Sequence, residues 1–113
     1  MNNNSEELEE FIGSSNTWRR DALDVIRRIP AGYLATYGRV ADMVREKGHS
    51  VGPRQIAWFR RRLYELLGHE SNFPLHRIAK IGDVNSLSDS EETKQCNDTM
   101  RTEEGFFENP RWL

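Results

Sequence analysis

Residues 52–67, GPRQIAWFRRRLYELL, decide the fold, because they predict one amphipathic helix with two different faces. Pro53 fits the first helical turn, and Gly68 follows the last apolar pair as a C-terminal stop. Apolar residues recur at spacings of three and four, and they predict a core-facing side made of Ile56, Phe59, Leu63 and Leu66 or Leu67. The opposite side holds Arg54, Ala57, Trp58 and Arg61.

This second face combines two arginines with a residue that has a very small side chain. A groove wall could therefore approach the helix backbone at Ala57 while the guanidinium groups of Arg54 and Arg61 reach past it. The same residues also fit an ordinary solvated charged face, so the helix alone leaves both interpretations open.

Two further helices are predicted ahead of this one. The first begins near Asn16 or Thr17, ends near Arg28, and has an apolar stripe at helical spacing. Thr36 can cap the second helix, which carries Tyr37 in its first turn and ends at Gly48. Two helices joined by a short turn, the second one basic, form the outline of a helix-turn-helix, although many helical hairpins share that outline.

Length and composition favour one soluble, intracellular domain. The 113 residues suffice for a single modest core. No apolar run approaches the ~20 residues that cross a membrane, and the N-terminus lacks the pattern of a secretory signal. Cys96 is the only cysteine, and no Cys/His cluster has zinc-ligand spacing. We therefore expect neither a disulfide nor a metal or other cofactor.

The net charge of -2 hides a strongly uneven distribution along the chain. Residues 1–16 carry -4, residues 17–80 carry +7 and residues 81–113 carry -5. A basic block between two acidic ends favours a polyanionic partner such as nucleic acid. We expect residues 1–16 to form a flexible acidic tail or a short edge element, and residues 17–113 to form the domain.

Residues 73–78, FPLHRI, predict an extended or turning segment, because the residue before a proline avoids the α region. Alone, they also fit a polar turn over a core. Three ordered stretches, IPAGYLATYGRVADMV (29–44), GPRQIA (52–57) and PLHRI (74–78), resemble the DNA-binding domain of the O6-alkylguanine-DNA alkyltransferases. The resemblance covers roughly residues 18–105. It implies an α+β, mostly helical fold with a winged-helix-like helix-turn-helix.

One departure from that family concerns its chemistry. The nucleophilic cysteine of the enzymes corresponds here to Leu75, so the acceptor for the alkyl group is missing. In this the chain resembles the alkyltransferase-like proteins, which bind alkylated guanine in DNA without repairing it. The resemblance implies a monomeric, non-enzymatic binder of O6-alkylguanine in double-stranded DNA that flags the lesion for nucleotide excision repair proteins. It would act in the cytoplasm on the nucleoid, or in a eukaryotic nucleus, without membrane contact.

The resemblance also assigns the DNA contacts. Arg54 matches the arginine that enters through the minor groove and fills the gap left by a flipped nucleotide. Tyr37 matches the tyrosine that presses on the phosphate beside the target and favours its rotation out of the stack. Ala57 takes the place of a family glycine on the groove-facing side. The helical spacing, rather than the resemblance, places Trp58 and Arg61 on the same side as further DNA contacts.

The lesion pocket falls on Pro74, Leu75, His76 and Ile78. By resemblance, the main-chain carbonyls of Leu75 and Ile78 accept hydrogen bonds from the guanine amino group. His76 and Glu104 match the relay that ionises the thiol in the enzymes. Because no thiol is present, the pair would serve only to hold the pocket turn in place.

Other departures favour a second hypothesis, a general DNA-binding or regulatory protein with a degenerate pocket. Trp58 stands where the family has glycine or a small polar residue, and Leu67 replaces an asparagine. The stretch Asn85–Leu87 lacks the arginine that senses the lesion in alkyltransferase-like proteins. A third hypothesis makes Cys96, on a helix predicted between Ser88 and Gly105, the alkyl acceptor of a transferase. A small buried thiol is the commoner role for such a residue.

Overall fold

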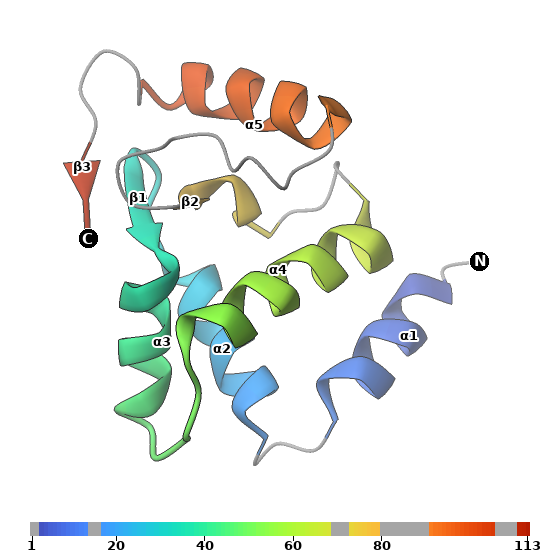
Figure 1. Cartoon of the computed structure of the whole chain (residues 1–113). Helices are drawn as coiled ribbons and strands as arrows, with labels where there is room; N and C mark the ends of the chain where they lie inside the picture. The colour runs from blue at the N-terminus through green and yellow to red at the C-terminus, as the bar shows by residue number, and fades with distance from the viewer. Residues whose placement is uncertain (1–2, 14–16, 69–72, 80–90, 106–110) are drawn as a thin grey trace.

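The computed structural model of this chain describes residues 3–13, 17–68, 73–79, 91–105 and 111–113, with side chains from residue 6 onward. These residues form, in order (Figure 1), α1 (Asn3–Ile12), α2 (Trp18–Arg27), β1 (Tyr33–Thr36), α3 (Tyr37–Arg45), α4 (Pro53–Leu67), the 3-10 helix η1 (Leu75–Arg77), β2 (Ile78–Ala79), α5 (Glu91–Glu103) and β3 (Arg111–Trp112). The expected α+β, mostly helical fold is confirmed. Within the described residues, no helix is long and apolar enough to cross a membrane.

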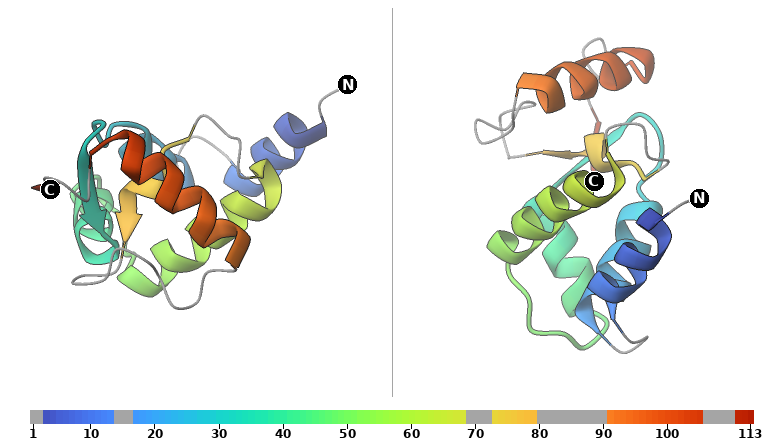
Figure 2. Two further views of the ribbon diagram at one scale, coloured as in Figure 1. Left: turned by 90° about the horizontal axis from the view of Figure 1, so that it is seen from above. Right: turned by 90° about the vertical axis from the view of Figure 1, so that its right-hand side faces the viewer.

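The helix α4 crosses the middle of the molecule and joins its other parts (Figures 1 and 2). α1, α2 and α3 lie on one side of it, and η1 and α5 lie on the other. Ile56, Phe59 and Leu63 are completely buried, as the spacing predicts. Each such side chain contributes about 1.5–3 kcal/mol when it leaves water. Gly68 ends α4 with a φ of +75°, in the left-handed region that glycine adopts at little cost.

Threonine side chains cap the N-terminal ends of α2 and α3. The hydroxyl oxygen of Thr17 accepts a hydrogen bond from the Arg20 N–H at the start of α2. The hydroxyl oxygen of Thr36 accepts one from the Arg39 N–H at the start of α3. Each cap satisfies an N–H group that has no partner inside the helix. The caps place Tyr37 as the first residue of α3, as predicted.

A small parallel sheet of order β2-β1-β3 joins the C-terminal strand β3 and the strand β2 to β1. Ala35 pairs with Ile78 across β1 and β2, and Tyr33 pairs with Arg111 across β1 and β3. Because β1 runs directly into α3, this pairing fixes residues 74–78 beside the start of α3. The sheet therefore positions the predicted pocket turn against the predicted helix pair.

The N-terminal segment differs from the predicted flexible tail, because residues 3–12 form the packed helix α1. Ile12 is 1% exposed, and Leu8 packs against the core. The ring of Phe11 stacks on Phe59, with 5.5 Å between their centroids and 18° between their planes. The low apolar content suggested a tail. However, the few apolar residues sit three to four positions apart on one helical face, which is sufficient for docking.

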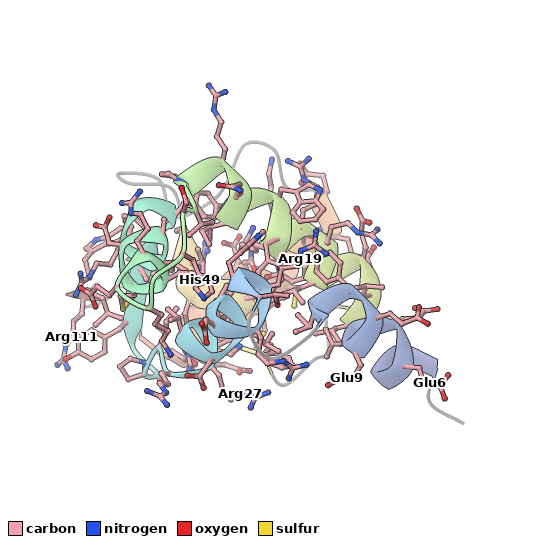
Figure 3. The ribbon with its side chains drawn as sticks, turned by 90° about the horizontal axis from the view of Figure 1, so that it is seen from below. Glu6, Glu9, Arg19, Arg27, His49 and Arg111 are labelled. Carbon is pink, nitrogen blue, oxygen red and sulfur yellow. The ribbon has the colours of Figure 1, made fainter. Side chains whose placement is uncertain are left out.

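Arginines of α2 hold α1 against the rest of the molecule. Arg20 forms an ion pair with Glu9, with 2.9 Å between nitrogen and oxygen. Arg19 donates a hydrogen bond of 2.8 Å to the main-chain oxygen of Phe11, and its guanidinium lies 4.7 Å from the centre of the Phe11 ring. Figure 3 shows Glu6 and Glu9 on α1 at one end of the molecule and Arg111 at the opposite end.

Candidate functional site

The outer face of α4 carries the predicted DNA-contact residues. Arg54, Trp58 and Arg61 are exposed, and Ala57 is half-buried. Across the described residues, neither Arg54 nor Arg61 forms an ion pair with an acidic side chain, whereas acids pair with Arg20, Arg28, Arg45, Lys47, Arg62, Arg77 and Lys94. Among the described residues, no carboxylate neutralises the positive charge on the outer face of α4.

Trp58 is only partly available on that face. Its ring centroid lies 5.5 Å from that of Phe11 in α1, and the guanidinium of Arg19 lies 5.1 Å from its ring centre. The side chain nevertheless remains 40% exposed. One part of Trp58 thus serves the contact between α1 and α4, and the remaining edge faces solvent beside Arg54 and Arg61.

A buried arginine on α4 connects this helix to both of the other predicted site segments. Arg60 is 2% exposed. Its Nε donates a hydrogen bond of 3.0 Å to the main-chain oxygen of Leu75. Its Nη1 donates to the hydroxyl oxygen of Tyr37 at 3.4 Å, and its guanidinium lies 5.0 Å from the centre of the Tyr64 ring. The structure therefore brings Tyr37 and Leu75 together through Arg60.

Sequence reasoning missed Arg60, although a signal was present. The residue follows Ile56 by four positions and precedes Leu63 by three, so it lies within the apolar stripe of α4. An arginine at such a position has to be buried with its donors satisfied or has to distort the packing. That placement distinguishes Arg60 from the neighbouring Arg61, which lies on the outer face.

The predicted pocket residues form a tightly packed turn. Pro74, Leu75, His76 and Ile78 are all buried, and the Leu75 side chain, 1% exposed, belongs to the main hydrophobic core. Arg101 of α5 is 0% exposed and supports this turn from the far side. Its Nε donates to the main-chain oxygen of His76 at 2.8 Å, and its Nη2 donates to that of Ile78 at 3.3 Å.

The structure also brings together the two residues predicted as a relay remnant. Nε2 of His76 lies 3.1 Å from Oε1 of Glu104. Arg77 donates to the same carboxylate, with 2.5 Å between Nη2 and Oε2, and its Nη1 donates to the main-chain oxygen of Ile29 at 2.7 Å. Glu104 thus joins the pocket turn to the end of α5, and Arg77 joins the turn to the end of α2.

Burial and charge shift the protonation of this pair. Desolvation by burial lowers the pKa of His76 below its ordinary 6.5, and it outweighs the hydrogen bond and the charge of Glu104, which raise it. Burial by itself would raise the pKa of Glu104. Hydrogen bonds from Arg77 and His76, together with their charges, outweigh it and lower that pKa below 4.5. At neutral pH the pair is therefore a neutral imidazole beside a carboxylate.

No known family model, curated protein or solved structure matches this chain. The candidate site is therefore defined by the geometry of the described residues alone.

Two predicted features, Cys96 and Leu67, lie apart from this cluster. Cys96 is half-buried on α5, where its Sγ lies 3.9 Å from Sδ of Met100, and the buried face of α5 is formed instead by Thr93, Asn97 and Arg101. Leu67 is half-buried and packs against the core. The stretch Asn85–Leu87, which the resemblance matches to the lesion-sensing arginine, lies outside the described residues.

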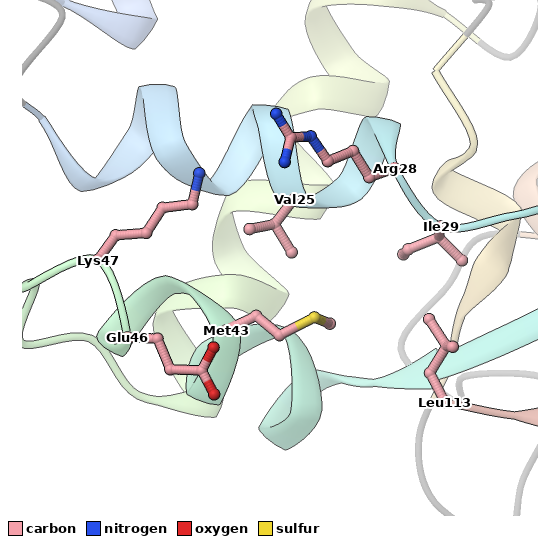
Figure 4. Close-up of a pocket in the computed structure, with 7 residues that line it drawn as sticks. All are labelled: Val25, Arg28, Ile29, Met43, Glu46, Lys47 and Leu113. Carbon is pink, nitrogen blue, oxygen red and sulfur yellow. The ribbon is translucent and has the colours of Figure 1, made fainter.

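A hollow of about 200 Å³ between α2 and α3 lies away from this cluster (Figure 4). Its lining consists of Val25, Arg28, Ile29, Met43, Glu46, Lys47 and Leu113, and none of the predicted site residues contributes to it. A second hollow, of about 240 Å³ and more open, adjoins the first turn of α4 and is lined by Arg45, Ser50, Val51, Gly52 and Gln55. The start of a helix carries partial positive charge, which favours nearby phosphate.

Proposed function

We propose that this chain binds double-stranded DNA through the outer face of α4 and holds an O6-alkylguanine rotated out of the base stack, without transferring its alkyl group. The helices α3 and α4 would then be the helix-turn-helix of a winged-helix-like, alkyltransferase-like domain, with α4 in the minor groove. The observation that carries the proposal is the hydrogen-bonded link from Tyr37 through Arg60 to Leu75, because it joins the duplex-facing helix pair to the pocket turn.

The charge distribution on α4 supports contact with a duplex. Arg54 and Arg61 are exposed and free of ion pairs within the described residues, so they can neutralise phosphates and release counterions without first breaking a salt bridge. Ala57, which lies between them on the same face, permits close approach of the groove wall. Arg39, exposed in the first turn of α3, adds positive charge to the helix pair.

In this proposal, Arg54 fills the space vacated by the flipped nucleotide and stacks on the neighbouring bases. Tyr37 presses on the adjacent phosphate. Unstacking costs a few kcal/mol and costs least at a damaged pair, which gives part of the selectivity. Leu75 offers no nucleophile, so binding is reversible and the protein is not an enzyme. It would act as a monomer and pass the lesion to nucleotide excision repair proteins.

A second candidate function is sequence-independent or regulatory DNA binding on the same face of α4. The packing of the pocket turn favours it, because the Leu75 side chain lies in the core and Phe11 covers part of Trp58. Under this alternative the duplex is bound through phosphate contacts alone, and no base leaves the stack.

Binding of the protein to two matched duplexes, one of which contains a single O6-methylguanine, separates these functions. Fluorescence anisotropy at one fixed salt concentration would give both dissociation constants. We expect binding to be at least several-fold tighter to the lesion duplex. Equal binding would leave only the general DNA binder, and absence of binding to both duplexes would overturn both proposals.

Single substitutions test which residues produce the preference for the lesion duplex. Arg54→Ala should remove most of the lesion preference. Arg28→Ala, which removes an exposed arginine that follows the last residue of α2 and is paired with Asp24, serves as the matched control and should leave binding unchanged. Mass spectrometry after incubation with the lesion duplex should show no gain of alkyl mass. A gain would instead identify a transferase, with Cys96 as the candidate acceptor.

A further inference from the structure

We infer that α1 is an autoinhibitory element, which limits the access of DNA to the outer face of α4 because its carboxylates repel the phosphate backbone of a duplex that docks there. The inference rests on the part of the proposed function that places a duplex on α4, and it does not depend on the pocket turn. In this role α1 weakens the binding of damaged and undamaged DNA alike.

Two aromatic rings join α1 to the proposed duplex face. The ring centroid of Phe11 in α1 lies 5.5 Å from that of Trp58 in α4. Trp58 follows Arg54 by four positions and precedes Arg61 by three, so the three side chains share one face of the helix. Figures 1 and 2 show α1 alongside α4. The helix α1 therefore borders the residues that are proposed to contact phosphates.

The helical period places two acidic side chains on the flank of α1 that lies at this border. Glu7 precedes both Glu10 and Phe11, by three and four positions, so the three residues lie on one side of the helix. Both glutamates are exposed. Glu9 instead lies on the opposite flank, where it forms an ion pair with Arg20 of α2 at 2.9 Å.

The cations closest to this flank have other partners. The guanidinium groups of Arg19 and Arg62 lie 4.7 and 5.7 Å from the centre of the Phe11 ring. Arg19 donates a hydrogen bond to the main-chain oxygen of Phe11, and Arg62 forms an ion pair with Glu65. Among the described residues, no cation forms an ion pair with either carboxylate of the border flank. A phosphate near Trp58 would therefore meet two negative charges.

The repulsion between exposed charges depends on salt. At ~0.1 M ionic strength it is screened over about 10 Å, and the screening distance shortens as salt is added. Removal of the two carboxylates should therefore tighten duplex binding most at low salt. Because phosphates carry no information on the bases, the ratio of lesion to unmodified affinity should stay the same.

The test measures binding of the full chain to a duplex with one O6-methylguanine and to the matched unmodified duplex, by fluorescence anisotropy at two salt concentrations. A double variant, Glu7→Gln with Glu10→Gln, removes both charges and keeps the size of the side chains. We expect it to bind both duplexes about fivefold more tightly than wild type at ~50 mM salt, and less than about twofold more tightly at ~200 mM salt.

Two further double variants assign the gain to charge at this position. Glu7→Asp with Glu10→Asp keeps both charges and should bind as wild type does. Glu91→Gln with Glu103→Gln removes two exposed carboxylates from α5, on the other side of α4, and changes the net charge equally. It should bind within about twofold of wild type. Thermal unfolding checks that these exposed substitutions leave the fold intact.

The outcomes separate the inference from the proposed function. Equal binding by wild type and the α1 glutamine variant, a gain that salt does not reduce, or the same gain in the α5 variant would overturn the inference and leave DNA binding through α4 in place. Absence of binding by every variant to both duplexes would overturn both. A salt-sensitive gain without any lesion preference would support the inference and leave only the general DNA binder.

Discussion

Oε1 of Glu104 lies 3.1 Å from Nε2 of His76, and this contact links the pocket turn to the end of α5. The imidazole is 3% exposed, and the carboxylate also forms an ion pair with the guanidinium of Arg77. In the proposed function, the pair activates no nucleophile. Its geometry instead makes the packing of the turn depend on protonation.

Acidification should destabilise the protein in two stages. The pKa values of His76 and Glu104 are both lower in the folded state than their ordinary values, so the unfolded state takes up protons first. Both groups therefore contribute fully to the free energy of unfolding at neutral pH. That free energy falls as the pH drops below 6.5, because His76 is protonated more readily in the unfolded state, and it falls further below 4.5 for the same reason at Glu104. Urea unfolding at a series of pH values measures this. In His76→Gln the first decline should be smaller, and an unchanged decline would exclude His76 as its source.

Arg101→Lys should lower the free energy of unfolding by about 2 kcal/mol, because one ammonium cannot reproduce the hydrogen bonds of a guanidinium to two main-chain carbonyls. Urea denaturation at neutral pH measures the change. The control is Arg61→Lys, at an exposed position, where a change within about 0.5 kcal/mol is expected. Equal stability of Arg101→Lys and wild type would mean that Arg101 does not support the turn.

Ile12→Ala tests the docking of α1. Removal of a fully buried isoleucine side chain should cost about 3 kcal/mol of unfolding free energy. The exposed Glu10 of the same helix provides the matched control, since Glu10→Ala should change stability by less than about 0.5 kcal/mol. If Ile12→Ala were as stable as Glu10→Ala, the segment would be a tail, as its composition predicts.

The salt dependence of DNA binding should distinguish the roles of Arg54 and Arg61, which lie on the same face of α4. Arg61→Ala should weaken binding to all duplexes alike and reduce the slope of log K against log salt by about 1, because one phosphate contact is lost. Arg54→Ala should act mainly on the ratio of lesion to unmodified binding. Identical effects of the two substitutions on that ratio would contradict the role given to Arg54.

The sequence predicted the parts of the fold that depend on local periodicity and caps. α2, α3 and α4 lie where apolar spacing, Thr17, Thr36 and Gly68 indicate. These signals act within a few residues, so they can be read without knowledge of the tertiary structure. The outer face of α4 was also predicted, because exposure follows from the same helical period.

The features that the sequence did not reveal depend on contacts between distant segments. Arg60 and Arg101 were not among the predicted site residues. Both are buried, and carbonyls of the 75–78 turn, which the fold brings to them, accept their hydrogen bonds. The segment that forms α1 was predicted as a flexible tail or a short edge element, because it is acidic and has few apolar residues. Its docking depends on aromatic rings of α4. Only the tertiary structure shows which charged side chains already have hydrogen-bond partners.

An NMR titration of the labelled protein with the O6-methylguanine duplex tests the central claim most directly. Amide signals of Tyr37, Arg54, Ala57, Arg61 and the 74–78 turn should shift on binding, while those around Val25 and Met43 in the hollow between α2 and α3 should not. With the unmodified duplex, the α4 signals should shift and those of the turn should remain. Shifts confined to other faces of the molecule, or none at all, would contradict DNA binding through α4.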